Sequence, residues 1–260
     1  TSRGAASAAQ NSALYWMQRW QQAAAQHAYA GTVTMMGGRG DLRSARIWHA
    51  VQHGRQMDRI EPLSGPPRVI FRTDRSVTTL FPQAQKGRVV HEGMQANALF
   101  PGLAPLAPEG LRKAASFYQA RVVAQERISN YETDVVVFVP TDGLRHAYRF
   151  WCEQKTGMLL KWQMLDIGNA SNDLARARVL REVAFSDVQI PAVVDFAAMQ
   201  RALQDTKGFQ MRQASSGHIP LHRAPSRAPA CIQRATRSSR PLSINGRSGL
   251  QPSPGCLGQR

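Results

Sequence analysis

The stretch 145–166 reads RHAYRFWCEQKTGMLLKWQMLD and carries the clearest strand pattern of the sequence. Its first half alternates: Tyr148, Phe150 and Cys152 fall on one face, while Arg149 and Trp151 fall on the other. After the turn at 155–157, the side chains that share one face of the return strand are Met158, Leu160, Trp162 and Met164. A two-residue period on both sides of a short turn predicts an antiparallel hairpin with one apolar face.

Segments with the same period lie on both sides of this hairpin, separated by turn residues. The glycine-rich segment 37–41 is a typical hairpin turn. The predicted strands, besides the hairpin and a short one at Val33 and Met35, are residues 43–52, 55–61, 68–72, 76–81, 117–124, 130–139 and 178–188.

Three helices are predicted among these strands, at residues 12–29, 109–115 and 191–203. In the first, Trp16 and Trp20 lie one turn apart, and Gly31 is expected to end the helix. The second lies in a proline-punctuated insertion at 100–116, which suggests a lid. Many consecutive antiparallel strands with few helices predict an α+β fold, a half-open antiparallel β-barrel with helices on its concave side.

Charge divides the 260-residue chain into a folded part and a tail. The formal net charge is +16, from 33 basic and 17 acidic residues, which points to an anionic partner. Residues 208–260 contain eight arginines and no acid, so they supply half of the excess. We predict a flexible start at 1–10, a barrel domain at 11–207 and a tail at 208–260 that is either disordered or translated from another reading frame.

The sequence offers no catalytic residue and no cofactor or metal motif. His49 and His53 have helical ligand spacing, but they lie in a predicted strand, where four residues span about 13 Å. Three cysteines fit neither a zinc site nor a disulfide framework. Whether Cys152 is a core thiol or an exposed one is left open. We therefore expect a binding protein and not an enzyme.

Two features are candidates for binding. Aromatic and methionine side chains on successive strands either form an ordinary core or line a cavity for an apolar ligand. This cavity set is Trp48, Phe71, Phe81, Tyr118, Phe138, Phe150, Met158, Trp162 and Met164. Arginines on the early strands are either a solvated face or a surface for lipid phosphates or an acidic polypeptide. This arginine set is Arg46, Arg55, Arg59, Arg68 and Arg72, with Arg43 and Arg75 beside it.

Several motifs of the strands are similar to one known family. The segments SARIWH at 44–49, LSGPPRVI at 63–70 and LFP at 80–82 resemble the first half of the RseB/MucB periplasmic regulators of the envelope-stress sigma factor (sigma-E/AlgU). The segments YRFWCE at 148–153 and TGMLLK at 156–161, followed by Leu165-Asp166, resemble a later hairpin of that family. The order and spacing agree over about residues 10–200.

This resemblance implies a specific fold and function. The amino-terminal domain of the family is similar to the lipoprotein carriers LolA and LolB. Family members bind the periplasmic domain of a membrane-bound anti-sigma factor and shield it from the site-1 protease. Binding of lipid or lipopolysaccharide fragments in the cavity is expected to release the anti-sigma factor. The resemblance therefore implies a periplasmic protein, and a start at Thr1 agrees with the expected mature form of such a protein.

The tail departs from the family pattern, because a smaller carboxy-terminal domain should follow the helix at 191–203. That domain contributes to partner binding in the family. Two other functions are therefore kept: a lipid or lipoprotein carrier of the LolA/LolB type, and a basic nucleic-acid-binding protein acting through the tail. We rank nucleic-acid binding last, because the tail has Phe209 as its one aromatic side chain. Self-association is left open.

Overall fold

The predicted hairpin at 145–166 forms two neighbouring strands of a twelve-stranded sheet in the computed structural model of the chain, which describes residues 12–37, 41–91, 108–167, 174 and 177–215. Trp162 lies opposite Phe150, and Met164 lies opposite Tyr148, as the alternation predicts. The strands are β1 (Tyr29–Met36), β2 (Leu42–Gln52), β3 (Arg55–Pro62), β4 (Val69–Thr73), β5 (Ser76–Phe81), β6 (Lys86–His91), β7 (Tyr118–Ile128), β8 (Tyr131–Pro140), β9 (Ala147–Glu153), β10 (Leu159–Asp166), β11 (Arg178–Gln189) and β12 (Gln210–Ser215).

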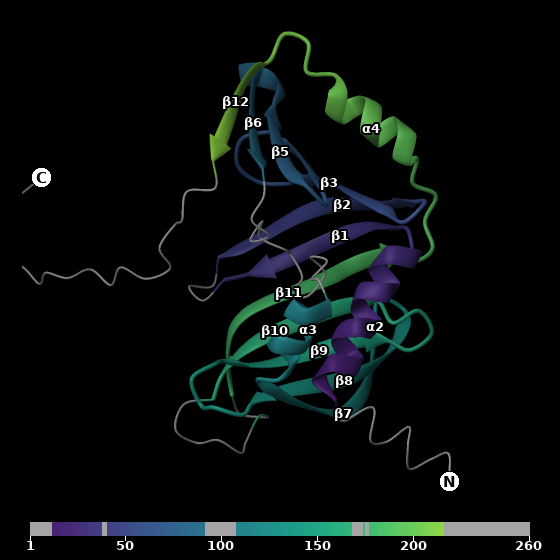
Figure 1. The fold of residues 1–260 in the computed structure, drawn as a ribbon, viewed down its shortest axis with the longest axis vertical. Helices are drawn as coiled ribbons and strands as arrows, with labels where there is room; N and C mark the ends of the chain where they lie inside the picture. The colour runs from purple at the N-terminus through teal and green to yellow at the C-terminus, as the bar shows by residue number, and fades with distance from the viewer. Residues whose placement is uncertain (1–11, 38–40, 92–107, 168–173, 175–176, 216–260) are drawn as a thin grey trace, which may run out of the picture. The chain divides into compact units, whose positions relative to one another are not determined.

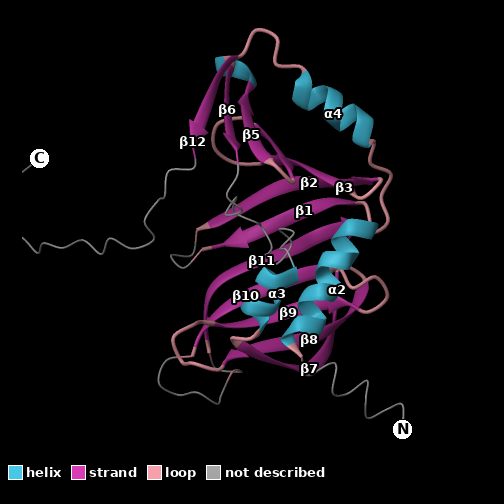
Figure 2. Ribbon diagram, viewed as in Figure 1, coloured by secondary structure: helices cyan, strands magenta, loops and turns pink. Residues whose placement is uncertain are grey.

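Two meanders meet side by side to make this sheet (Figure 1). Their order is β12-β6-β5-β4-β3-β2-β1-β11-β10-β9-β8-β7, and the join is the antiparallel pairing of β1 with β11. The described residues therefore form an open sheet, with β12 and β7 as its edges. The α+β class is confirmed, since the fold is mostly sheet with a few short helices (Figure 2). Closure into a half-barrel stays a prediction.

Helices cover both faces of the sheet. Helix α2 (Ala13–Gln26) and helix α3 (Pro108–Ala115) pack against each other, and both contact β7. Helix α4 (Phe196–Gln204) packs on β2 and β3. Its Phe196 lies with Met57 and Phe71, whereas Ile47 and Ile60 of the same strands belong to the core under α2. The expectation that all helices lie on one side is thus wrong for α4. None of the described helices is long and apolar enough to cross a membrane.

The first helix ends earlier than its sequence pattern predicts. Helix α2 ends at Gln26, and Tyr29 and Gly31 belong to β1. The ring of Tyr29 is buried and stacks on His49 of β2, with centroids 4.7 Å apart. A contact between residues so distant in sequence overrides local helix propensity. Gly31 is therefore a strand residue and does not end the helix.

Two strands were missed by the sequence analysis. Strand β6 follows a short 3-10 helix, η1 (Pro82–Ala84), and pairs with β5. Strand β12 pairs in parallel with β6 and lies in residues that were expected to belong to the tail. The folded part therefore continues beyond Lys207. The insertion at 100–116 is confirmed only in its helix α3, because residues 92–107 lie outside the described part, as do residues 1–11 and 216–260.

Candidate functional site

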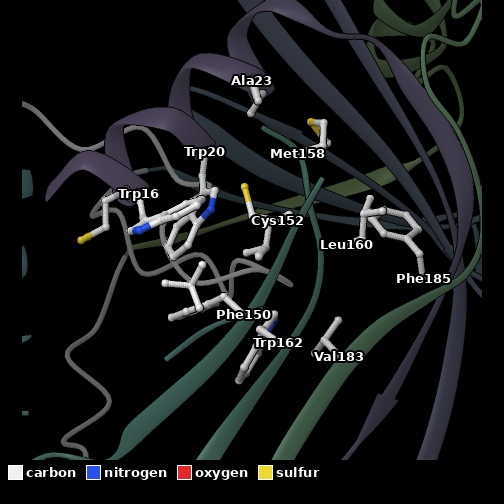
Figure 3. Packing of buried hydrophobic residues seen from close by; sticks show 14 of the residues in the cluster. Trp16, Trp20, Ala23, Phe150, Cys152, Met158, Leu160, Trp162, Val183 and Phe185 are labelled. Atoms are coloured by element: carbon white, nitrogen blue, oxygen red, sulfur yellow. The ribbon is translucent and has the colours of Figure 1, made fainter. Parts of the chain in front are cut away.

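The apolar face of α2 packs on buried aromatic side chains of the sheet (Figure 3). Trp16 and Trp20 project from successive turns of the helix, and both are buried. The ring centroid of Trp20 lies 4.5 Å from that of Phe150 and 5.4 Å from that of Phe138. The helix therefore occupies the space where a ligand cavity was predicted. We call the buried cluster of Trp16, Trp20, Phe138, Phe150, Cys152, Met158 and Trp162 the aromatic interior.

Two tyrosines and a methionine form the margin of the aromatic interior. Tyr118, Tyr148 and Met164 are half-buried beside it. The ring of Tyr148 lies 5.7 Å from Phe150 and 6.0 Å from Tyr118, measured between centroids. Burial, followed by the influence of Tyr148, raises the pKa of Tyr118 to about 12. The margin is therefore uncharged at neutral pH and offers an apolar surface with phenol hydroxyls.

Cys152 lies within the aromatic interior and is a core thiol. Its side chain is fully buried in the same cluster as Trp20. Burial raises the pKa of the Cys152 thiol to about 11, although Arg19 partly opposes this. Because nucleophilic attack requires the thiolate, this cysteine is a packing residue in the present structure.

The predicted cavity set does not form one site. Phe138, Phe150, Met158 and Trp162 are buried in the aromatic interior, and Tyr118 and Met164 lie at its margin. The other three members lie elsewhere: Trp48 and Phe71 pack in the cluster under α4, and Phe81 is half-buried at the end of β5.

The physical reason for this division is the alternation of side chains along a strand. Ile47 faces α2, so its neighbour Trp48 must face α4. Sequence patterns show which residues share a face of one strand, but they do not show which face of the sheet that is.

The arginine set is divided too, because some of its members already have partners. Arg72 is mostly buried and bonds the carboxylate of Asp58, 2.7 Å from Nε to Oδ2. Arg59 binds Glu61 and lies over the ring of Trp48. The remaining members of the set are Arg46, which is exposed on β2, Arg55, whose guanidinium lies 5.3 Å from the Phe196 ring, and Arg68, which donates to the Pro66 carbonyl oxygen. Arg72 is therefore unavailable as a surface contact.

A hollow of about 500 Å³ lies beside α4, over the ends of β3, β4, β5 and β6. Met57 and Leu203 are among its lining residues, and Arg55, Arg75 and Asp74 contribute charges of both signs. This mixture of charges favours no single class of ligand. Among the residues that the structure describes, there is also no group of three side chains arranged to hold a metal ion.

Sequence reasoning missed the two tryptophans of α2 as site residues. Their four-residue spacing was visible, but the pattern alone did not show that they enter the sheet interior. It also missed His49 and Asp58, which are buried and lie 2.7 Å apart, Nδ1 to Oδ1. Because these residues lie on two strands, a linear motif does not reveal the pair.

A family model and a curated relative point to the same family. The family described as MucB/RseB N-terminal domain matches residues 12–203. The sigma factor AlgU regulatory protein MucB of Pseudomonas aeruginosa is 23% identical over 152 residues, which cover 58% of this chain and 45% of that protein. The chain thus spans less than half the length of this curated relative.

Solved structures show the same fold. A crystal structure of MucB in complex with MucA(peri) matches with a TM-score of 0.51 at 20% identity, covering 71% of this chain and 58% of the matched one. The Pseudomonas aeruginosa MucA/MucB complex matches with a TM-score of 0.53 at 21% identity, covering 72% and 60%. Since the family match covers most of the chain and the fold agrees with it, the chain belongs to the MucB/RseB family through its N-terminal domain.

Proposed function

We propose that this chain is a non-enzymatic periplasmic regulator that binds the periplasmic domain of a membrane-bound anti-sigma factor. The observation that carries the proposal is the family match over residues 12–203 together with the fold of MucB, which has been crystallised with MucA(peri). Binding would shield the anti-sigma factor from proteolysis and so restrain the envelope-stress response. The formal charge of +16 suits an acidic segment of the partner.

The same proposal assigns lipid or lipopolysaccharide fragments to the aromatic interior. Trp16 and Trp20 occupy that space in the present structure. An acyl chain would therefore have to displace α2 and replace its contacts with Phe138 and Phe150. Such an exchange keeps the aromatic face of the sheet covered, while the apolar face of α2 leaves it, so the contacts of the acyl chain must offset the cost of exposing that helix face to water.

The first test is a titration of the full chain with the anti-sigma periplasmic domain at moderate salt. We expect a Kd of about 1 μM or tighter. The charge-reversed variant Arg46→Glu/Arg68→Glu should bind at least about tenfold more weakly, since both residues belong to the arginine set and neither is ion-paired among the described residues. The matched control is Arg121→Glu/Arg127→Glu, which reverses two exposed arginines of the edge strand β7 and should bind like the unchanged chain.

Each alternative function has its own outcome in this experiment. Acyl chains that co-purify with a chain unable to bind the anti-sigma domain would identify a lipid or lipoprotein carrier. Binding to duplex DNA that weakens steeply with salt, without binding to the anti-sigma domain, would identify the nucleic-acid binder. Either result contradicts the proposed regulator.

A further inference from the structure

His49 makes two hydrogen bonds inside the protein, and both partners are acceptors. Its Nε2 lies 2.7 Å from the carbonyl oxygen of Ala24, and its Nδ1 lies 2.7 Å from Oδ1 of Asp58. The side chains of His49 and Asp58 are 4% and 7% exposed, so water has little access to either. A carbonyl oxygen only accepts, so Nε2 must carry a hydrogen.

The second hydrogen follows from the surroundings of Asp58. Arg72 donates to the other carboxylate oxygen of Asp58, Oδ2, through Nε at 2.7 Å and Nη2 at 2.6 Å. A guanidinium in this position keeps the carboxylate ionised, and an ionised carboxylate only accepts. Consistent with this, the pKa of Asp58 is lowered to about 2, because Arg72 and His49 together outweigh the effect of burial, which alone would raise it. Both ring nitrogens of His49 therefore donate, which makes the ring an imidazolium.

The carbonyl of Ala24 belongs to the last turn of α2, which ends at Gln26. The last four carbonyls of a helix have no partner within the helix and carry the negative end of its dipole. An imidazolium is well suited to that position. The titratable groups that face His49 are Asp58 from β3, Arg72 from β4 through Asp58, and Tyr29 from β1, whose ring stacks on His49 and whose pKa is raised by burial.

We propose that the imidazolium of His49 is a proton-dependent latch that holds the C-terminal turn of α2 on the sheet, and that loss of its proton releases this turn. With one proton fewer, either Nε2 faces the Ala24 carbonyl as a lone pair, or Nδ1 faces the Asp58 carboxylate as one. The remaining hydrogen stays on Nδ1, because its bond to the charged Asp58 carboxylate is stronger than a bond to a neutral carbonyl, and Nε2 then faces the Ala24 carbonyl oxygen as a lone pair. The latch is formed at low pH and is lost as the pH rises and the imidazolium loses its proton.

The latch bears on the proposed function because α2 also carries Trp16 and Trp20 into the aromatic interior. Release of its last turn would lower the cost of moving the helix aside for an acyl ligand. Only this last step rests on the proposed function. The protonation state of His49 and the anchoring of α2 follow from the contacts of this chain alone, and so they are testable without any partner.

The test uses the full chain with ¹⁵N-labelled histidine and measures hydrogen exchange in α2, corrected for the intrinsic effect of pH on exchange. At about pH 5, we expect the ring of His49 to show two protonated nitrogens and the last turn of α2 to be protected. At about pH 9, we expect one protonated nitrogen and protection at least about tenfold lower. His49→Gln should show the low protection at both pH values.

Two further variants make the result specific. His27→Gln removes the histidine at the C-cap of α2 and should keep the pH response of the unchanged chain. Asp58→Asn should keep α2 protected at both pH values, because an amide can accept from Arg72 and donate to Nδ1 of a neutral His49. A single protonated nitrogen at about pH 5 overturns the latch. So does protection of α2 that is equal at both pH values in the unchanged chain, or a His49→Gln variant that responds to pH as the unchanged chain does.

Discussion

At the scale of single residues, Asp58 shows how a buried charge is compensated in this fold. Its carboxylate lies between an arginine on the neighbouring strand β4 and a histidine on the neighbouring strand β2. Burial of an unpaired carboxylate would be strongly unfavourable, whereas pairing on both sides keeps it ionised. Three strands are therefore held in register by one side chain, in addition to their backbone ladders.

The lowered pKa of Asp58 predicts an acid-dependent loss of stability. The pKa falls from 3.8 to about 2 in the folded protein, so the ionised carboxylate stabilises the fold fully above about pH 4. This contribution, about 2 kcal/mol, should be lost as the pH falls from about 4 to about 2. Urea unfolding at several pH values measures it. Asp58→Asn should lack this step, while Asp205→Asn, at the exposed C-cap of α4, should retain it.

Trp20 is the residue whose truncation should cost the most in the aromatic interior. It is 1% exposed and contacts the rings of Phe138 and Phe150. We expect Trp20→Ala to lower the free energy of unfolding by about 3–5 kcal/mol, since it leaves a large cavity. Leu144→Ala, at an 87% exposed site, is the control and should change it by less than about 0.5 kcal/mol. Equal losses in both variants would show that α2 does not pack as described.

At the scale of elements, the join between β1 and β11 decides whether the two meanders form one sheet. Gly31 lies opposite Val188 at this join, and a bulge follows between Thr32 and Val33. A Cβ atom at Gly31 would collide with the backbone oxygen of Asp187 and lie 3.0 Å from Cα of Val188. The absence of a side chain at Gly31 therefore allows the close approach of the two strands.

Gly31→Ala should consequently weaken the join. We expect the free energy of unfolding to fall by about 1–3 kcal/mol, because backbone atoms of β11 must move to make room. The matched control is Gly110→Ala in α3, where an added Cβ meets nothing within 4 Å. That change should be neutral or stabilising by up to about 1 kcal/mol, since alanine favours helix over glycine. Chemical denaturation measures the free energy of unfolding of both variants. An unchanged value for Gly31→Ala would contradict the close approach of β1 and β11.

At the scale of the whole molecule, the positive charge of residues 208–260 allows the proposed regulator to be distinguished from a protein that binds nucleic acid non-specifically. Replacement of the eight arginines in 208–260 by glutamine would lower the formal charge from +16 to +8, because 33 − 8 leaves 25 basic residues against 17 acidic ones. We expect affinity for the anti-sigma domain to change less than about threefold at moderate salt. Affinity for duplex DNA at low salt should fall at least about tenfold. Parallel titrations of the unchanged chain and of this variant measure both effects. A large loss of affinity for the anti-sigma domain would show that residues 208–260 make the main contact with it.

Much of the sheet was predictable because its strands follow a strict two-residue period. The hairpin at 145–166 became β9 and β10 with the predicted pairing, and the helix predicted at 109–115 became α3. Strand β6 was missed, because half of the residues in its segment Lys86–His91 are charged or polar and because the strand lies next to the edge strand β12. Strand β12 was missed because its pairing with β6 depends on the tertiary fold and not on a local pattern.

The sequence by itself determined the strands with two faces, the helix of the two tryptophans and the family resemblance, because these depend on local periodicity and on motifs along the chain. The tertiary structure alone decided which face each strand turns to α2. It separated Trp48 and Phe71 from Phe138 and Phe150, and it brought His49 to Asp58 and to the end of α2. Those contacts join residues from different elements, and only packing fixes which elements meet.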